Sequence, residues 1–131
     1  VVNLAMFAEM QGATGVVLNA PTANEVLRHV ADTIDIPTVV TVARDDTDFD
    51  KRIEAGTSIF NVSAAADTPK IVKMIREKYP DIPIIATGGP TDESIRETIK
   101  AGANAITWTP PSNGEIFRDI MAAYRENKPH P

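Results

Sequence analysis

A repeat of 46 residues constrains the fold of this chain more than any other feature. Pro37 opens a short apolar run, and Gly56, 19 residues later, closes the amphipathic segment that follows. Pro83 and Gly102 repeat this arrangement with the same interval of 19 residues. In each copy the glycine stands where a helix can end in a left-handed residue, and a second apolar run follows it. The repeat therefore predicts a strand–helix–strand unit that is used at least twice.

The rest of the chain continues the alternation of short apolar runs and amphipathic segments, without a long linker. We expect strands at 15–19, 38–42, 58–62, 82–87 and 105–109. We expect helices at 23–34, 46–55, 68–79, 92–101 and 114–126, and a further helix that begins at Val1. Three of the helix starts carry short polar side chains that can cap free N–H groups, at Thr22, Asp46 and Thr91. Repeated units of this kind imply right-handed crossovers and a parallel sheet.

The length of the chain bears on which parallel architecture it forms. A truncated third copy of the repeat, Gly12 to Val17, has no opening strand, so we expect the fold to begin upstream of Val1. A complete (β/α)8 barrel needs about 250 residues, or about 200 at the compact end. We predict a single α/β domain over 1–131, forming about five strands of a TIM-type phosphate-binding barrel, with a polar Pro-containing tail at 127–131. The alternative is a flavodoxin-like open sheet of five strands.

Composition excludes several classes of partner. The formal net charge is −5 and acidic and basic residues are interspersed, so no cationic stripe predicts nucleic-acid binding. No apolar run approaches the roughly 20 residues of a membrane-spanning helix. The chain has no cysteine, which excludes disulfides and zinc–thiolate sites. We expect a cytoplasmic protein without a cofactor.

Ligands of parallel β/α folds bind at the carboxyl ends of the strands. Thr87, Gly88 and Gly89 follow the fourth expected strand. Two glycines allow a ligand to approach the backbone closely and can present consecutive N–H groups to it. A helix begins immediately afterwards, near Thr91, and its N-terminus favours an anion. We therefore predict that Gly88 and Gly89 bind a phosphate; the other interpretation is a plain tight turn before a capped helix.

A second loop with similar properties precedes the last expected helix. Ser112, Asn113 and Gly114 form this loop, and their N–H groups can face an anion in the same way. In barrels a phosphate commonly lies between the last two loops of this kind. These three residues therefore complete the predicted phosphate site.

The ends of the other strands supply the predicted substrate pocket, which consists of Asn19, Arg44, Asn61 and Thr87. Amide and hydroxyl groups at strand ends can bind polar groups of a ligand, and they can equally satisfy the local backbone. Arg44 can bind a carboxylate or a phosphate, whereas the alternative is a surface ion pair with one of the aspartates that follow it.

The remaining polar and aromatic candidates are weaker. The aspartates between positions 45 and 48 resemble a metal cluster, but two of them fall in the first turn of a helix, where acids cap well, so we predict no metal site. His29 lies in the middle of a helix and His130 in the tail, and neither is placed for acid–base catalysis. The catalytic residues are therefore unknown. Trp108 lies beside the last strand, where we expect it to pack.

From about Gly12 to Ile120 the order of these features resembles the later part of the 2-keto-3-deoxy-6-phosphogluconate aldolase family. The segment GATGVVLNAPTANEVLRHV resembles a strand with a pocket edge followed by a helix, and IPTVVTVARDDTDFDKRIEAG resembles the next strand, turn and helix. The segment IPIIATGGPTDESIRETIKAGANAI resembles the phosphate strand of the family. This TGG-to-AGA pattern recurs across related phosphate-binding barrels, so it is specific for the superfamily and not for one reaction.

The chain departs from this family at its catalytic positions. The family has a Schiff-base lysine on the strand read here as 58–62, where Asn61 takes its place, and an amide cannot form an imine. The acid–base glutamate of the family comes from an early strand that this chain does not contain. The last strand of the family ends in a Gly-Ser phosphate contact, whereas this chain has Thr107 to Ser112. Aldolase chemistry by that mechanism is not expected.

A second resemblance is to the receiver domains of response regulators. The segments KYPDIPIIATGG and AGANAITWTPPSNGEIFRDIMAAYR resemble the last two strands and helices of a receiver, with Thr87 at its hydroxyl position. Thr109 stands where a receiver has lysine, and Asn61 stands where it has the phosphoacceptor aspartate. The resemblance therefore implies at most a degenerate receiver that is not phosphorylated.

These features together predict that the chain binds a small phosphorylated metabolite. We expect it to be part of a lyase- or isomerase-type barrel enzyme that acts on a phosphorylated sugar or keto acid, and to be inactive alone. The alternatives are a non-catalytic receiver-like signalling or interaction domain and a structural scaffold fragment. Because a partial barrel leaves two strand edges exposed, we also expect a homo-oligomer.

Overall fold

A computed structural model describes residues 1–108 and 110–126 of the chain, in which strands and helices alternate. In chain order the elements are α1 (Val2–Met10), β1 (Val16–Leu18), α2 (Asn24–Thr33), β2 (Thr38–Val42), α3 (Phe49–Glu54), β3 (Ile59–Val62), the short 3₁₀ helix η1 (Ala65–Asp67), α4 (Thr68–Lys78), β4 (Ile84–Thr87), α5 (Asp92–Ala101), β5 (Ala105–Thr107) and α6 (Asn113–Arg125). Every strand and helix expected from the sequence is present, with ends displaced by at most a few residues. Thr109, the predicted tail at 127–131 and His130 within it lie outside the described residues.

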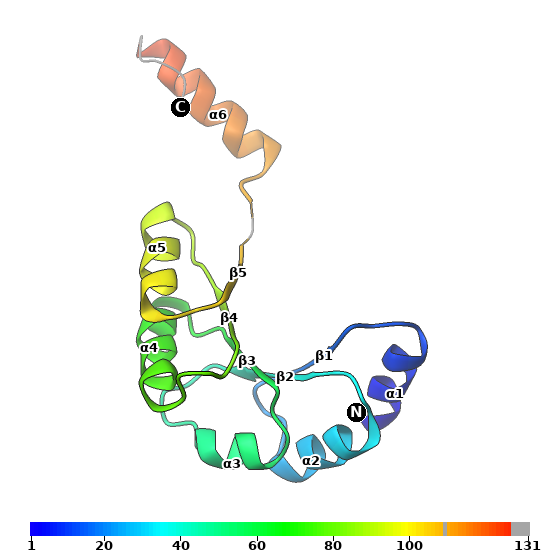
Figure 1. Cartoon of the computed structure of the whole chain (residues 1–131). Coiled ribbons are helices and arrows are strands. Elements are labelled where there is room, and N and C mark those ends of the chain that lie inside the picture. The colour runs from blue at the N-terminus through cyan, green and yellow to red at the C-terminus, as the bar shows by residue number, and fades with distance from the viewer. Residues whose placement is uncertain (109, 127–131) are drawn as a thin grey trace.

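The five strands form one parallel sheet in which each strand pairs with the next strand of the chain, in the order β1-β2-β3-β4-β5. This is the order of a barrel wall, and Figure 1 shows the strands in an arc with α2 to α5 around its outside. A flavodoxin-like sheet has the order 2-1-3-4-5, with the first strand inside the sheet. The alternative prediction of a receiver-like open sheet is therefore wrong, because β1 lies at an edge.

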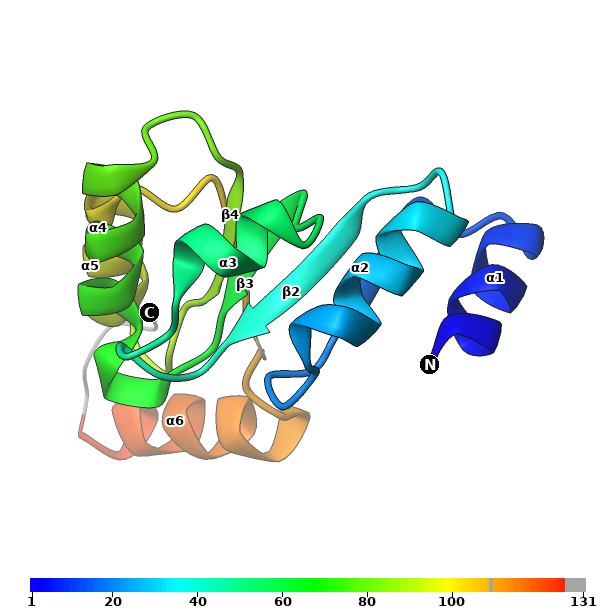
Figure 2. The same cartoon turned by 90° about the horizontal axis from the view of Figure 1, so that it is seen from below.

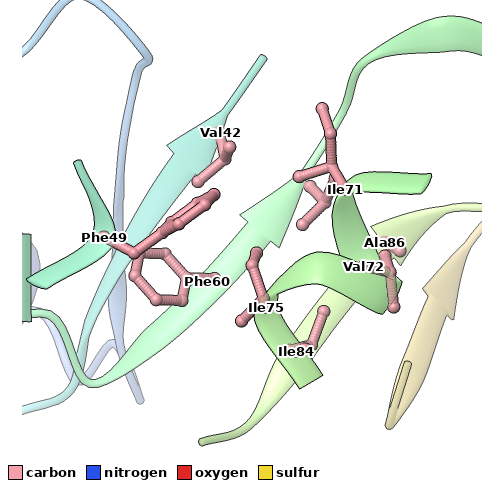
Figure 3. Close-up of a cluster of buried hydrophobic side chains, with 9 residues drawn as sticks. Val42, Phe49, Phe60, Ile71, Val72, Ile75, Ile84 and Ala86 are labelled. Carbon is pink, nitrogen blue, oxygen red and sulfur yellow. The ribbon is translucent and has the colours of Figure 1, made fainter. Parts of the chain in front are cut away.

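Side chains alternate along the strands between the helix-covered outside and the inside of the arc. The outward residues form two buried clusters with the helices, one around α4 and one around α2. Figure 3 shows the first cluster, in which Phe60 of β3 packs edge-to-face on Phe49 of α3, with 5.5 Å between ring centroids. Ile71, Val72 and Ile75 of α4 complete the cluster against β3 and β4. The inward face carries no helix in Figures 1 and 2.

The 46-residue repeat recurs in the hydrogen bonds that join its two strands. The N–H of Thr38 donates to Ser58 Oγ (3.2 Å), and the N–H of Ser58 donates to the carbonyl of Thr38 (2.9 Å). In the second copy the N–H of Ile84 donates to Asn104 Oδ1 (2.9 Å), and the N–H of Asn104 donates to the carbonyl of Ile84 (2.9 Å). Both glycines of the repeat are left-handed, with φ of 118° and 119°. The sequence repeat is thus a repeat of one local structure.

Two of the three predicted helix starts need correction. The residue that caps α2 is Ala23, without a side-chain hydrogen bond, so Thr22 does not cap it. The residue that caps α3 is Asp48, whose carboxylate accepts the N–H three residues later at 3.1 Å, so Asp46 lies before the helix. The third start is confirmed, because Thr91 caps α5 in a reciprocal capping box.

The first and last helices lie at the two ends of the arc. Figure 2 shows α1 beside α2, at the end of the sheet that β1 forms, and Figure 1 shows α6 beyond the end of β5. No residue of α6 is buried. Within the described ranges, none of the helices has the length and apolar character needed to cross a bilayer.

Candidate functional site

Polar side chains gather where the strands end on the inner face of the arc. Thr41 and Asn61 are partners in the register between β2 and β3, and Asn61 Nδ2 donates to Thr41 Oγ1 at 3.3 Å. Thr87 and Thr107 are partners in the register between β4 and β5, and both are exposed. In a parallel β/α fold this end of the sheet is the ligand-binding end. A ligand site is therefore expected at this end of the sheet.

The turn after β4 presents free hydrogen-bond donors. The hydroxyl of Thr87 and the N–H of Gly89 make no hydrogen bond within the described residues. Gly89 has a φ of +78°, and a Cβ there would lie 2.7 Å from Ser94 Oγ, so the position requires glycine. The hydroxyl of the neighbouring Ser94 is not free for a ligand, because it donates a hydrogen bond to the carbonyl of Gly88 (2.9 Å) and takes part in the α5 cap.

Gly88 does not have the role that the sequence suggested. Its N–H donates to the carbonyl of Thr107 at 2.9 Å and extends the pairing of β4 with β5. Gly88 is also buried, and a Cβ would lie 2.7 Å from Ile106 and 2.8 Å from Ile95. The expectation that both glycines present N–H groups to a ligand is therefore wrong for Gly88, and its glycine is required by packing.

A hollow of about 510 Å³ lies at the ends of β4 and β5. Its lining consists of Thr87, Gly89, Pro90, Thr107 and Trp108. Trp108 is 52% exposed, so the expectation that it packs within the chain is wrong. The physical reason is that β5 forms the edge of the described sheet, so no further described strand lies beside it for the indole to pack against. The hollow thus combines hydroxyl groups, one backbone N–H and an aromatic face.

A second hollow adjoins the first through the residues that both share, which are Thr87, Gly89 and Pro90. It lies between the turns that precede α4 and α5. Besides Thr87, its threonines make internal bonds: Thr68 Oγ1 accepts the N–H of Ala64 (2.9 Å), and Thr98 Oγ1 donates to the carbonyl of Ser94 (2.8 Å). The free donors of Thr87 and Gly89 therefore lie on the border of both hollows, and that of Thr107 belongs to the hollow beside Trp108.

The structure does not bring the other predicted pocket residues into this hollow. Asn19 is exposed and lines a groove between α1 and β1, at the far edge of the sheet. Asn61 is held by Thr41 on the inner face of the arc. Arg44 pairs with Asp46 at 3.0 Å, with 78% of its side chain exposed, so the surface ion pair is the interpretation that the structure supports.

The aspartates between β2 and α3 all have local partners. Asp45 forms an ion pair with Lys70 at the start of α4 (3.0 Å), and the hydrogen bond from Lys70 lowers the pKa of the Asp45 carboxyl. Asp46 pairs with Arg44, and Asp48 caps α3. Across the described part of the chain, no group of three His, Cys, Asp or Glu residues is arranged to hold a metal ion.

Ser112, Asn113 and Gly114 lie at the start of α6. The hydroxyl of Ser112 accepts the N–H of Glu115 (3.2 Å), and a Glu115 carboxylate oxygen accepts the N–H of Ser112 (3.3 Å). Figure 1 places this start of α6 beyond the end of β5, away from the turn between β4 and α5. The two halves of the predicted phosphate site are therefore separate in this structure.

Sequence reasoning missed the contributions of Pro90 and Trp108 to the site, and it did not identify Thr41 as the partner of Asn61. The pairing of Thr41 with Asn61 could have been found from the alternation of side chains along each strand, because positions 41 and 61 share a register and a face. The exposure of Trp108 depends on what lies beside β5, which local sequence does not contain.

Comparison with known proteins supports the barrel architecture. The inosine-5′-monophosphate dehydrogenase of Chlorobaculum parvum is 36% identical over an alignment of 64 residues, which covers 46% of this chain and 13% of that protein. The inosine-5′-monophosphate dehydrogenase of Halalkalibacterium halodurans is 41% identical over an alignment of 58 residues, which covers 41% of this chain and 12% of that protein. The chain thus spans about an eighth of the length of these relatives. No family model matches it.

Among solved structures, phosphonopyruvate hydrolase in complex with oxalate and Mg²⁺ superposes with a TM-score of 0.67. The similarity covers 91% of this chain and 59% of that chain, at 17% sequence identity, and therefore concerns the fold alone. The chain is an α/β protein with the architecture of a partial TIM-type barrel. The finer resemblance to the 2-keto-3-deoxy-6-phosphogluconate aldolase family stays unconfirmed.

Proposed function

We propose that the chain binds a small phosphorylated metabolite in the hollow at the ends of β4 and β5. One observation carries the proposal: the hydroxyl groups of Thr87 and Thr107 and the N–H of Gly89 line one hollow, and all three are free of hydrogen bonds to the described residues. Hydroxyl and backbone N–H donors are groups that bind phosphate oxygens in β/α barrels, and the position at the ends of late strands fits.

The charges around the hollow set the strength of this binding. Asp92 and Glu93 occupy the first turn of α5, where their negative charge opposes the attraction of the helix N-terminus for an anion. The lining itself carries no cation. We therefore expect weak binding, with a Kd on the order of 1 mM for a phosphate that the neutral donors alone hold.

Ser112, Asn113 and Gly114 form the second part of the proposed phosphate site. They would reach a ligand in the hollow only if α6 moved back toward β5, because α6 starts away from it. The N–H groups of Asn113 and Gly114 make no capping bond, since the box at this helix start uses Ser112 and Glu115. Ligand-dependent changes at these two residues would therefore report closure of α6 over the site.

Any chemistry of the complete protein belongs, in this proposal, to the lyase or isomerase class, on a phosphorylated sugar or keto acid. The lining of the hollow offers no group that would act as a strong acid, base or nucleophile. We accordingly propose that these residues bind the substrate and that the described chain is inactive alone. A scaffold fragment without ligand is the outcome that the experiment below would reveal.

The test is a titration of the isotope-labelled chain with inorganic phosphate and with a triose phosphate, followed by amide NMR. Saturable shifts at Thr87, Gly89 and Thr107 are the expected result. A Thr87→Val variant keeps the shape of the side chain and removes one donor, so we expect about tenfold weaker binding, the effect of one hydrogen bond to a charged group.

Thr14→Val is the matched control, because Thr14 is exposed and lies outside the hollow. Its affinity for phosphate should equal that of the unaltered chain. A well-dispersed spectrum that ignores both ligands would refute the phosphate site and leave the scaffold interpretation.

A further inference from the structure

We propose that the ligand site continues from the hollow across the inner face of the sheet to Asn61 and Thr41, and that these two side chains bind hydroxyl groups, so that the ligand is a sugar phosphate. This inference rests on the proposed function, because the phosphate would occupy the donors at the ends of β4 and β5. It adds a second subsite and selects the phosphorylated sugar over the phosphorylated keto acid.

The inner face of the sheet changes from apolar to polar in the same way on four neighbouring strands. Each strand from β2 to β5 directs two side chains inward, because the residue between them packs outward against the helices. The first of the two is apolar and the second is polar: Val39 and Thr41, Ile59 and Asn61, Ile85 and Thr87, and Ala105 and Thr107. The polar layer therefore extends from the hollow to β2, at the end of the sheet where barrels bind their ligands.

Asn61 is the least expected member of this polar layer. Asparagine is depleted in strands, and β3 is the central strand of the sheet. A half-buried amide in such a place loses bonds to water that other partners have to replace. Within the described residues its side chain makes one hydrogen bond, from Nδ2 to Thr41 Oγ1 at 3.3 Å. A residue that breaks the local pattern of its strand is typical of a functional site.

The pair of Asn61 and Thr41 retains free hydrogen-bonding capacity. Among the described residues, Asn61 Oδ1 accepts no hydrogen bond, and the hydroxyl of Thr41 donates none. No buried side-chain nitrogen or oxygen in this part of the chain lacks a partner, so the free Oδ1 is open to solvent. The pair thus offers an acceptor beside a donor. A ligand hydroxyl group matches this combination, because it both donates and accepts.

The charges at this end of the sheet separate a sugar from a keto acid. The four residues of the polar layer are neutral, and the cations that follow β2 and β3 are paired: Arg44 with Asp46, and Lys70 with Asp45. A carboxylate only accepts hydrogen bonds and is bound most strongly by a cation. It would face Asn61 Oδ1, a second acceptor. The hydroxyl groups of a sugar meet no such conflict.

The spacing of the two subsites fits one small molecule. Asn61 pairs with Ile85 in the register between β3 and β4, and Thr87 lies two residues further along β4. The separation of neighbouring strands and the rise along a strand place the Cα atoms of Asn61 and Thr87 about 8 Å apart. A short sugar chain with a terminal phosphate bridges this distance, with the phosphate at Thr87 and hydroxyl groups at Asn61.

The experiment measures, by calorimetry, the affinity of the chain for phosphate esters of equal carbon-chain length. Erythritol 4-phosphate carries hydroxyl groups, butyl phosphate carries none, and the phosphate ester of 4-hydroxybutanoate carries a terminal carboxylate. We expect erythritol 4-phosphate to bind about tenfold tighter than butyl phosphate, the gain from two ordinary hydrogen bonds. The carboxylate ester should bind no tighter than butyl phosphate. In NMR spectra the side-chain amide signals of Asn61 should shift with erythritol 4-phosphate alone.

Variants of the pair assign this gain to its two side chains. Asn61→Ala should remove most of the advantage of erythritol 4-phosphate, and Thr41→Val should remove part of it. Neither should change the affinity for butyl phosphate, which reports that the fold and the phosphate subsite are intact. Asn3→Ala is the matched control, because Asn3 is exposed on α1, outside the polar layer, and its variant should keep the full advantage.

The outcomes distinguish this inference from the proposed function. Equal affinities for erythritol 4-phosphate and butyl phosphate, or an advantage that survives Asn61→Ala, would overturn the hydroxyl subsite and leave the phosphate site in place. Tightest binding of the carboxylate ester would overturn the sugar and favour the keto acid. If no ester binds, the proposed phosphate function fails, and this inference fails with it.

Discussion

The structural role of Gly88 can be tested without a ligand, because close packing around this residue leaves no room for a side chain. A Cβ at this buried position would approach Ile106 and Ile95 within 2.7 and 2.8 Å, too close for two carbon atoms. We expect Gly88→Ala to lower the free energy of unfolding by about 1–3 kcal/mol, as overpacking of a core does. Gly114→Ala is the control, since the nearest atom to its Cβ would be 3.9 Å away.

Urea unfolding measures both variants. An unchanged stability of Gly88→Ala would show that β5 or α5 moves to accommodate the methyl group, and it would remove the packing argument. The result also decides how the site should be mutated: if Gly88→Ala is destabilised, a loss of phosphate binding in that variant says nothing about a contact with phosphate.

The site could be predicted from sequence only as far as local rules determine it. Gly89 follows from a turn that needs a left-handed residue, and Thr87 from its place at the end of an apolar strand. The bond from the Gly88 N–H to Thr107 could not be predicted, because it depends on how β5 pairs with β4. The role of Arg44 could not be decided from sequence, because an exposed arginine beside aspartates can either bind a ligand or form a surface ion pair.

A single arginine joins α4 to the loops before β4 and β5. Arg76 is partly buried, and its guanidinium donates to backbone carbonyls and one side chain at 2.7–3.3 Å. Its acceptors are the carbonyls of Tyr79, Pro80, Ile82 and Gly102 and the Oδ1 of Asn104. We expect Arg76→Met to lower the free energy of unfolding by about 2–3 kcal/mol, because several partly buried carbonyls lose charge-assisted partners at once.

Arg28→Met is the matched control for the Arg76→Met variant. Arg28 lies exposed on α2 and donates one hydrogen bond, to the carbonyl of Glu54 at 3.1 Å. Its replacement should change stability by less than about 0.5 kcal/mol, the usual range for surface positions. Equal effects of the two substitutions in urea unfolding would mean that water replaces the guanidinium of Arg76 without cost.

The helices and strands were predictable because residues within each copy of the repeat mark where the strand begins and where the helix ends. A proline before the strand, a glycine after the helix and a polar residue two positions later recur in both copies, and the structure gives them the same bonds. The start of α3 was misplaced because burial of Phe49 against Phe60 sets it. Asp46 was the apparent cap, but it pairs with Arg44 instead.

The whole sheet has two free edges among the described strands, one along β1 and one along β5. Large apolar side chains lie exposed near both, with exposed fractions between 37% and 79%. Near β1 they are Val1, Leu4, Met6, Phe7, Met10 and Val17. At the end of β5 lies Trp108, and α6, beyond the end of that strand, exposes Ile116, Phe117, Ile120 and Tyr124. Unpaired strand edges flanked by apolar surface are typical of surfaces that associate.

We propose that two copies associate through both edges at once. A two-fold axis parallel to the strands places β1 of one copy beside β5 of its partner, and the same contact forms on the other side. All strands then stay parallel and no edge remains open, so assembly stops at a dimer. Light scattering coupled to size-exclusion chromatography should therefore find a dimer at micromolar concentration.

Variants at the two edges test whether both take part in one interface. Leu4→Lys at the β1 edge and Ala105→Lys at the β5 edge should each give monomers, since each places a charge in the interface. Met74→Lys is the control, because Met74 is exposed on α4, away from both edges, and its variant should remain dimeric. If only the Leu4 variant dissociates, two β1 edges meet each other and the closed arrangement is wrong. If the unaltered chain is monomeric at all concentrations, neither edge pairs with a second copy.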